Sequence, residues 1–241
     1  MSLLEIKGLT KQFGGLTAVK NVDFDIDEGE IVSIIGPNGA GKTTIFNLIS
    51  GFYPVTAGTM KFKGRSIVGL KPHQVCQRGI GRTFQIVKPF GSMTVLENVL
   101  VAGLCRFGFE EARDEAMKCL EFTGLAERAD QPAKSLTLGG RKRLEMARAI
   151  VARPDLVLLD EVVAGLNPRE TEETIQLIRR LRERGVSAAA GVEHVMRVVM
   201  TLSDRVIVLN HGEKIAEGTP QEIAGDRRVI EAYLGEGYAQ S

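Results

Sequence analysis

The chain has 241 residues, of which 44% are hydrophobic and 25% charged, and its formal net charge is +1. This balance implies no bulk attraction to nucleic acid or to an anionic membrane, so any anion binding has to be local. No uncharged apolar run approaches the roughly 20 residues of a membrane span, and the amino-terminal MSLLEIKGLT lacks the pattern of a secretion signal. We therefore expect a globular protein of the cytoplasm.

The first quarter of the chain predicts strands around one helix. Alternating residues indicate strands over residues 4–10 and 18–27, followed by a short apolar strand over residues 30–35. A glycine-rich turn then leads to residues 43–51, whose apolar spacing is helical and which end in a glycine. Another pair of strands is expected within residues 58–67.

The middle of the chain is predominantly helical. Helices are predicted over residues 94–104 and 110–125, and the second is amphipathic with a glycine stop at Gly124. A third helix, rich in Arg and Ala, is expected over residues 138–153. These helices indicate a helical lobe inserted into the rest of the fold.

The last third alternates strands with helices. Residues 155–160 form a continuous apolar strand of the kind that is buried on both faces in a parallel sheet. A charged helix with one solvated face is expected over residues 168–185, and strands follow over 185–192, 205–210 and 212–218. The whole pattern predicts an α/β fold with a mostly parallel sheet.

The sharpest local motif is GPNGAGKT at residues 36–43, which matches GxxxxGK[ST] between a strand and a helix. Glycines let consecutive N–H groups turn toward phosphate oxygens, and the start of the helix adds its positive dipole end. We expect Lys42 to reach the β- and γ-phosphates, Thr43 to bind Mg²⁺, and Thr44 to donate to the α-phosphate. A turn that binds nothing is the alternative, which the context disfavours. The expected nucleotide-binding residues here are Asn38, Gly39, Ala40, Gly41, Lys42, Thr43 and Thr44.

Two carboxylates, Asp160 and Glu161, end the apolar strand at residues 155–160. Phosphoryl transfer requires a metal that neutralises phosphate charge and a group that orients the attacking water. We expect Asp160 in the Mg²⁺ shell and Glu161 as the base that faces the water. The alternative is a strand that exits into solvent through two acids, but the phosphate motif in the same chain favours the catalytic interpretation.

The three cysteines, Cys76, Cys105 and Cys119, have no CxxC spacing. A metal site or a disulfide framework is therefore not expected, and the ordinary interpretation is buried or neutral thiols.

Further segments occur in the order found in ABC ATPases. Gln85 in GRTFQ resembles the glutamine loop, and LTLGG at residues 136–140 resembles the signature segment. Residues 163–168 follow the acid pair as the D-loop does, His194 in VEHVM resembles the switch histidine, and Phe13 resembles the aromatic that stacks on adenine. Singly, each has an ordinary structural explanation. The order of these segments across nearly the whole chain is what resembles the ABC ATPase family.

The resemblance implies a single ABC ATPase domain over residues 1–241. It consists of a P-loop NTPase core with a mostly parallel sheet, an antiparallel β subdomain and an inserted α-helical subdomain. The ATP-binding core is expected over about residues 1–85 and 155–241, and the helical subdomain with the signature segment over about 86–154.

The resemblance also implies roles for particular residues. Glu161, His194 and Gln85 form the catalytic set, and Thr43, Gln85 and Asp160 the Mg²⁺ ligands. Phe13 and Val19 belong to the nucleotide-binding set. Two subunits face each other head to tail, so Thr137 and Gly139 of one subunit contact the ATP that is bound by the other. The implied cofactors are ATP and Mg²⁺.

Within the family, the segments RTFQ, MTVLENVLVA and AGLNP resemble those of the ATPases of branched-chain amino acid importers. The ATPases of urea, amide or other amino acid importers share much of this sequence pattern. The implied partners are transmembrane permease subunits and a second ATPase subunit, as homodimer or heterodimer, with a solute-binding protein acting indirectly and no nucleic acid. The implied location is the inner face of the plasma membrane.

Two rival hypotheses remain. ABC ATPases of DNA repair or of ribosomes usually carry a long coiled-coil insertion or two cassettes, and this chain shows neither pattern. A module that binds ATP without turning it over is the second rival, and only the altered signature segment supports it.

Four positions depart from the family pattern. Thr137 replaces a serine and keeps the hydroxyl, whereas Gly140 stands where glutamine is usual. Val162 replaces a proline after Glu161, and Asn167 stands where many ABC ATPases have aspartate. Because the catalytic set is intact, we expect ATP hydrolysis, with a rate that the changed signature segment modifies.

Overall fold

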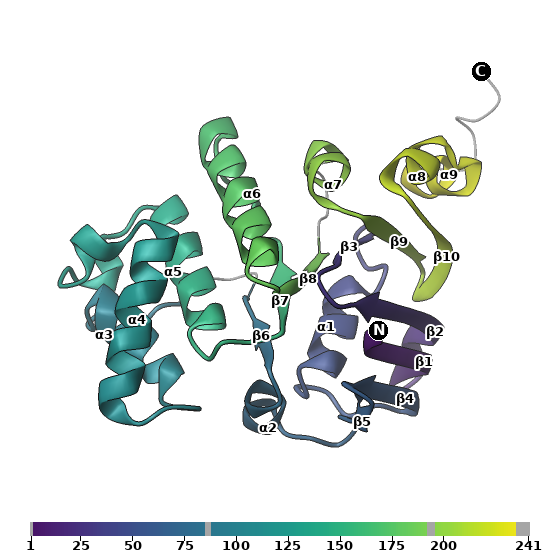
Figure 1. The fold of residues 1–241 in the computed structure, drawn as a ribbon. Helices are drawn as coiled ribbons and strands as arrows, with labels where there is room; N and C mark the ends of the chain where they lie inside the picture. The colour runs from purple at the N-terminus through teal and green to yellow at the C-terminus, as the bar shows by residue number, and fades with distance from the viewer. Residues whose placement is uncertain (1, 85–87, 192–195, 235–241) are drawn as a thin grey trace. The chain divides into compact units, whose positions relative to one another are not determined.

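The computed structural model describes residues 2–84, 88–191 and 196–234. The chain divides into two compact units, residues 1–72 with 187–241, called unit 1, and residues 73–186, called unit 2 (Figure 1). Across the described ranges, every helix falls short of the length and apolarity that crossing a membrane requires.

Unit 1 contains an antiparallel sheet in which the long first strand is paired on both sides. Leu4 and Ile6 lie on one face of this strand and are almost completely buried, as the two-residue period of a strand requires. The register with β2 shifts between Ile6 and Leu9, and Leu9 is again fully buried. This sheet is the antiparallel β subdomain expected from the sequence. Its strands are β1 (Ser2–Phe13), β2 (Leu16–Asp27), β4 (Ala57–Phe62) and β5 (Arg65–Ser66), in the order β2-β1-β4-β5.

The other strands of unit 1 run in the order β10-β9-β3-β8, and β3 pairs in parallel with both of its neighbours. All five residues of β3 are buried, as a central parallel strand requires. The strands are β3 (Ile31–Ile35), β8 (Ser187–Gly191), β9 (Arg205–Asn210) and β10 (Glu213–Gly218), and the helices of this unit are α1 (Lys42–Ile49), α7 (Met196–Leu202), α8 (Pro220–Gly225) and α9 (Arg227–Leu234).

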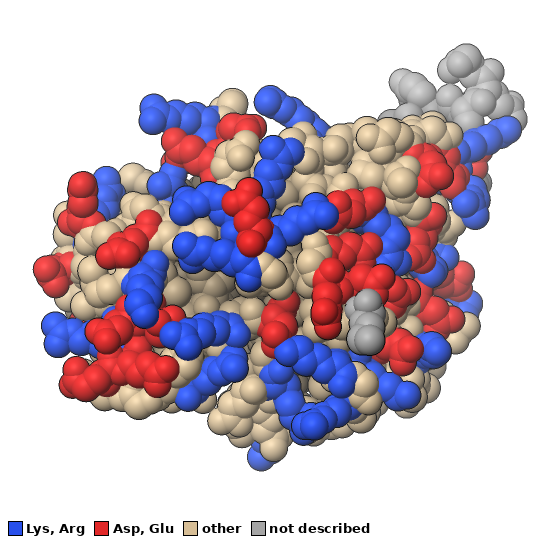
Figure 2. Space-filling model, viewed as in Figure 1, with Lys and Arg blue, Asp and Glu red and all other residues tan. Residues whose placement is uncertain are grey.

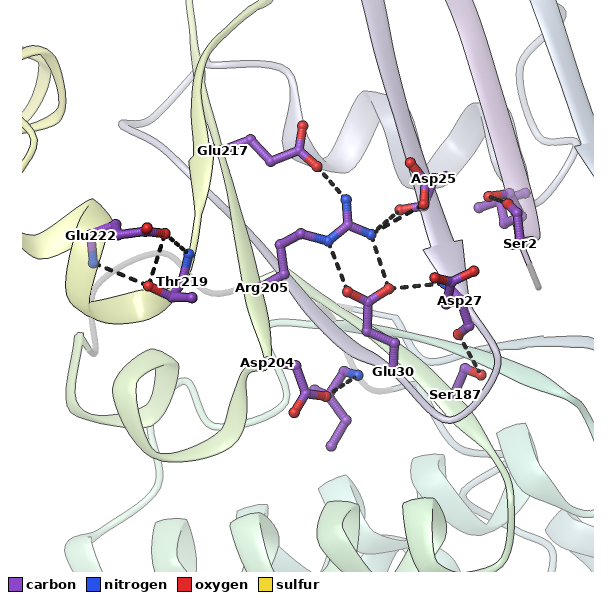
Figure 3. A network of polar contacts seen from close by, with 12 residues as sticks. Ser2, Asp25, Asp27, Glu30, Ser187, Asp204, Arg205, Glu217, Thr219 and Glu222 are labelled. Atoms are coloured by element: carbon purple, nitrogen blue, oxygen red, sulfur yellow. Dashed lines mark hydrogen bonds and ion pairs between the residues drawn. The ribbon is translucent and has the colours of Figure 1, made fainter.

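Arg205, the first residue of β9, joins the two sheets of unit 1 (Figure 3). Its guanidinium donates to both carboxylate oxygens of Glu30, at 2.8 and 2.9 Å, and to the main-chain oxygen of Asp25 on β2 at 2.8 Å. It also pairs with Glu217 on β10. The hydrogen bonds that Arg205 donates to Glu30 raise the pKa of Arg205. The planar, bidentate geometry fixes the parallel strands against the antiparallel sheet.

Unit 2 combines a short parallel strand pair with a cluster of helices. The strands are β6 (Ile80–Arg82) and β7 (Leu156–Asp160), and all five residues of β7 are buried. Three helices, α3, α4 and α5, pack on one another (Figure 1). The helices are α2 (Pro72–Gln77), α3 (Val95–Gly103), α4 (Phe109–Thr123), α5 (Leu138–Ile150) and α6 (Pro168–Glu183), with 3₁₀ turns η1 (Ala126–Arg128) and η2 (Ala133–Ser135).

Local signals in the sequence fix where these helices begin and end. Thr94 caps α3 through a capping box with Glu97, and Asn167 caps α6 in the same way. Gly124 ends α4 in the left-handed conformation with φ 71°, as the glycine stop predicted. The fold class is therefore confirmed as α/β with parallel and antiparallel sheets and a set of inserted helices.

The face of the molecule drawn in Figure 2 carries charged side chains of both signs. On the face shown in Figure 2, lysine and arginine side chains alternate with aspartate and glutamate side chains over both units. This distribution agrees with the net charge of +1 and leaves anion binding to local geometry.

Candidate functional site

The loop between β3 and α1 has a backbone that only glycine can follow at two points. Gly36 has φ 150°, and a Cβ there would lie 2.1 Å from the main-chain oxygen of Leu209. Gly41 has φ 103°, and its Cβ would lie 2.7 Å from the main-chain oxygen of Ala18. The glycines of the motif are therefore required by close backbone approach as well as by conformation.

Lys42 begins α1 and bends back over the loop. Its ammonium group donates to the main-chain oxygens of Gly36 at 2.6 Å and Pro37 at 2.9 Å, and the residue is only 5% exposed. These two hydrogen bonds hold the ammonium group of Lys42 against the main chain of the loop. The first turn of α1 contains no acidic residue, so nothing there competes with an anion for the helix N–H groups.

A cavity of about 140 Å³ lies on this loop. Thr43 and Thr44 are half-buried in its wall, whereas Asn38 is exposed and does not line it. Residues 39–44 of the motif therefore border this hollow, and among them are two threonines and one lysine. The lining residues are Ala18, Gly39, Ala40, Gly41, Lys42, Thr43 and Thr44.

Phe13 lies at the end of β1 with 41% of its surface exposed. Its ring meets the ring of Tyr53 edge to face at 5.2 Å between centroids, and the ammonium group of Lys11 lies 4.7 Å from its centroid. An exposed aromatic face is available for stacking. Val19, by contrast, is fully buried on β2, and its side chain supports Gly41 from below.

In unit 2, Asp160 is the last residue of β7 and is 3% exposed. Arg82, at the end of β6, pairs with its carboxylate at 3.1 Å, and both side chains are almost fully buried. The hydroxyl of Thr83 accepts a hydrogen bond from the main-chain N–H of Asp160 at 3.1 Å. The carboxylate therefore has a fixed position and a cation beside it, as a buried charge requires.

Glu161 turns the chain away from β7 with φ 48°, in the left-handed region. A non-glycine residue in this conformation is strained by about 1–2 kcal/mol and has to be held there by its surroundings. The ammonium group of Lys142, on α5, donates to the main-chain oxygen of Glu161 at 2.6 Å. This bond ties the turn at Glu161 to the helix α5.

The signature segment forms the start of α5. Thr137 caps this helix, its hydroxyl accepting from the main-chain N–H of Gly140 at 3.2 Å. A Cβ on Gly139 would lie 2.4 Å from a carboxylate oxygen of Glu170 on α6. An added Cβ at position 139 would therefore displace the Glu170 side chain, which accepts the N–H of Asn167 in the capping box of α6. At Gly140, by contrast, the nearest atom that an added Cβ would meet lies 3.3 Å away, on Leu136.

A hollow of about 420 Å³ lies between the start of α5 and the start of α6. Three arginines border it, and Arg143 and Arg169 both pair there with Glu173. Glu170 and Glu173 line it as well, so the lining has a formal excess of one positive charge beside the amino end of α5. Its lining residues are Gly124, Leu125, Arg128, Thr137, Gly139, Gly140, Arg143, Asn167, Arg169, Glu170 and Glu173.

Two predicted site residues, Gln85 and His194, lie outside the described residues. Three residues that the sequence did not single out contribute to the described parts of the site: Ala18 in the loop cavity, Arg82 beside Asp160, and Lys142 beside Glu161. Arg82 stands within GRTFQ and Lys142 within RKRLEMARA, so both were inside segments already recognised as motifs.

Comparisons with known proteins identify the family of this chain. Residues 19–164 match the family described as ABC transporter, and residues 213–239 match the family described as branched-chain amino acid ATP-binding cassette transporter. The chain is 46% identical to the high-affinity branched-chain amino acid transport ATP-binding protein LivG of Salmonella typhimurium, over 97% of this chain and 98% of that protein.

Solved structures resemble the whole chain as well. The ADP conformation of MJ1267, an ATP-binding cassette of an ABC transporter, superposes with a TM-score of 0.90 at 31% identity, covering 98% of this chain and 100% of that one. The dimeric post-hydrolysis state of the ATP-binding cassette MJ0796, bound to ADP and Pi, gives a TM-score of 0.80 at 30% identity over 90% of this chain and 98% of that chain.

Proposed function

Because this chain belongs to the ABC transporter family of ATP-binding proteins, we propose that it powers the import of branched-chain amino acids. The family establishes an ATPase domain that binds nucleotide. The observation that carries the finer proposal is the match of residues 213–239 to the branched-chain amino acid family. The identity with LivG over nearly the full length of both chains supports the same conclusion.

The loop after β3 is the proposed phosphate cradle. Its cavity is lined by residues 39–44, whose main chain would cradle the phosphates, and Lys42 contributes a point charge toward the β- and γ-phosphates. Lys42 already donates to two carbonyls of the loop, and phosphate oxygens would take over as stronger, charged acceptors. Asn38, exposed at the rim, is proposed to contact the nucleotide only once it is bound.

The adenine end is assigned to the end of β1. Phe13 presents an exposed ring for stacking, and Tyr53 and Lys11 hold that ring in place. Val19 acts indirectly in this proposal, because its buried side chain packs beneath Gly41. Its contribution is to the shape of the loop.

Mg²⁺ fits the donors that the chain provides. Thr43 offers a hydroxyl and Asp160 a nearly buried carboxylate, both of them the hard oxygen ligands that Mg²⁺ prefers. We assign these two residues, with Gln85, as the groups that would hold it. When bound, the ion neutralises charge that develops on the phosphates. Until then, Arg82 balances the charge of Asp160.

Glu161 is the proposed base that accepts a proton from the attacking water, and His194 is proposed to assist at the γ-phosphate. Asp160 ends β7 as a buried carboxylate paired with Arg82, whereas Glu161 follows in a left-handed turn, and we assign the two acids different roles on that basis. Lys142 holds the main chain of Glu161 and is a positioning residue in this assignment.

The second ATPase subunit is proposed to present its signature segment to each bound ATP. Thr137 and Gly139 stand at the start of α5, on a hollow bordered by arginines, where an anion would meet helix N–H groups and positive charge. The pair would work beneath permease subunits on the cytoplasmic side of the membrane, with a solute-binding protein delivering the solute to the permease.

Uptake measurements test the proposed solute. Cells of the source organism lacking this chain are complemented with the parent or with Lys42→Ala, and uptake of labelled leucine, urea and a short amide is measured. The proposal expects leucine uptake to be restored by the parent alone, with urea and amide uptake unaffected. Restoration of urea or amide uptake instead of leucine uptake would assign the chain to a related importer.

A further inference from the structure

Two of the three thiols meet within unit 2. Cys76 lies on α2 and Cys105 follows the end of α3, 29 residues further along the chain, and their sulfur atoms are 3.2 Å apart. Both residues are partly exposed. The side-chain amide of Gln77, beside Cys76, also reaches the main-chain oxygen of Cys105 at 3.5 Å. The sequence spacing gave no indication of this contact, because CxxC-type patterns report only neighbouring cysteines.

A positive charge is fixed beside the pair. The guanidinium of Arg106 donates to the main-chain oxygens of Ala152 at 2.7 Å and Arg153 at 2.9 Å, which holds it next to the Cys105 sulfur. The hydrogen bond between the two thiols, together with this guanidinium, lowers the pKa of Cys105 to about 7. The same hydrogen bond raises the pKa of Cys76. Cys105, beside the guanidinium and partly exposed, is therefore the thiol of the pair that more readily forms a thiolate.

Cys119 on α4 provides an internal contrast. It is buried, and burial raises the pKa of its thiol to about 12. A buried thiol of this kind reacts slowly with soluble reagents while the chain is folded. The three cysteines therefore divide into one inert residue and one reactive pair.

We propose that Cys76 and Cys105 form a redox site that closes reversibly to an intramolecular disulfide. The co-reactant is a low-molecular-weight disulfide of the glutathione class. The Cys105 thiolate attacks one of its sulfurs, forming a mixed disulfide and releasing one small thiolate. Cys76 then loses its proton to solvent and attacks the Cys105 sulfur, which releases the second small thiolate. Two protein thiols are oxidised and one small disulfide is reduced to two thiols.

The place of the cross-link suggests what it would constrain. It joins α2 to the end of α3 and closes a covalent loop over residues 76–105, which includes β6 and the position of Gln85 in the sequence. Closing such a loop reduces the conformations open to the segment between the two sulfurs. Disulfides of cytoplasmic proteins are usually of this transient, redox-sensing kind.

Intact-mass measurement of the full chain tests the proposal. The reduced chain is incubated with oxidised glutathione at neutral pH, quenched with acid, unfolded, and alkylated with N-ethylmaleimide. The parent is expected to lose two hydrogen atoms and to take up a single maleimide, at Cys119. Proteolytic peptides should show Cys76 joined to Cys105, and dithiothreitol should restore three alkylation sites.

Matched variants separate the steps. Cys76→Ser should retain glutathione as a mixed disulfide on Cys105, because the second thiol is missing, whereas Cys119→Ala should form the internal disulfide like the parent. The proposal is overturned if the parent takes up three maleimides after this treatment, if it accumulates glutathione adducts without the internal bond, or if Cys119 appears in the cross-linked peptide.

Discussion

The ammonium group of Lys142, on the helix that begins at the signature segment, donates a 2.6 Å hydrogen bond to the main-chain oxygen of Glu161. Lys142 is only 9% exposed, and burial lowers its pKa against the opposing effect of Glu161, Asp160 and Glu145. The bond holds Glu161 at φ 48°. One cation therefore links the signature helix to the strained turn that carries our proposed catalytic base.

Replacing Lys142 tests how much this hydrogen bond contributes to the rate of ATP hydrolysis. Lys142→Met keeps the aliphatic stem but removes the donor, so the turn at Glu161 should relax. Because a shift of about 1 Å at a reacting group costs on the order of a hundredfold in rate, kcat for ATP hydrolysis should fall by about ten- to a hundredfold. The KM for ATP should change little, since Lys142 is not assigned to nucleotide binding.

The matched control for that variant is Lys118→Met, which removes an exposed lysine in the same unit. It should leave both kinetic constants near those of the parent. Equal losses of kcat in the two variants would contradict a positioning role for Lys142, as would a Lys142→Met variant with full activity.

The phosphate loop should not accept a methyl group at Gly41. The added Cβ would lie 2.7 Å from the main-chain oxygen of Ala18, and φ is 103°. Gly41→Ala should therefore weaken binding of a fluorescent ATP analogue by at least about tenfold, equivalent to about 1.4 kcal/mol. Gly15→Ala, where an added Cβ meets no atom within 4 Å, should bind like the parent. Parent-like binding by Gly41→Ala would refute the assigned role of this loop.

The hydroxyl of Thr137 should matter for both stability and turnover. Thr137→Ala removes the cap of α5 and should lower the free energy of unfolding by about 1 kcal/mol, measured by urea denaturation. Thr137→Ser keeps the hydroxyl and should retain stability and hydrolysis close to the parent. If hydrolysis falls in the alanine variant only to the extent that folded protein is lost, the proposed contact with the opposite ATP is absent.

Glu115 on α4 should make stability depend on pH. Hydrogen bonds from Arg153 and Lys118 lower its pKa from 4.5 to about 2. The folded pKa lies below that of the unfolded chain, so the stabilisation is complete above the unfolded value and disappears as the pH falls toward the folded one. Because both cations are exposed, we expect it to be about 1 kcal/mol near neutral pH.

Urea denaturation of the parent and of Glu115→Gln at several pH values measures this contribution of Glu115 to the free energy of unfolding. The variant should be less stable near neutral pH, and the difference between the two should shrink as the pH is lowered through the usual range of a glutamate. Glu121→Gln, an exposed position on the same helix, serves as the control. A difference that stays constant with pH would show that the loss comes from packing alone.

Sequence reasoning predicted most of the fold because the decisive signals are local. A few neighbouring residues are enough to predict β7, from its apolar run, and the end of α4, from the glycine at position 124. The short elements α2 and β6, and the helices after β8, were not predicted. Their stability comes from tertiary contacts, such as Asp155 donating its main-chain N–H to Gly79 beside β6, which no short window contains.

Residues of the candidate site could be predicted only where they lie together in one continuous sequence motif. The phosphate loop is such a motif, and its cavity lies where the pattern placed it. Arg82 beside Asp160 and Lys142 beside Glu161 join residues far apart in the chain, so they became visible only in three dimensions. The contact between Cys76 and Cys105 belongs to the same class.

The most direct test of the motor assignment compares the parent with Glu161→Gln in Mg²⁺ and ATP, by steady-state hydrolysis and by size-exclusion chromatography in ATP. We predict that the parent hydrolyses ATP, whereas the variant binds ATP, does not turn it over, and accumulates as an ATP-bound dimer. A parent that binds ATP yet neither hydrolyses it nor dimerises, even with its permease, would contradict the account and favour an ATP-binding module without turnover.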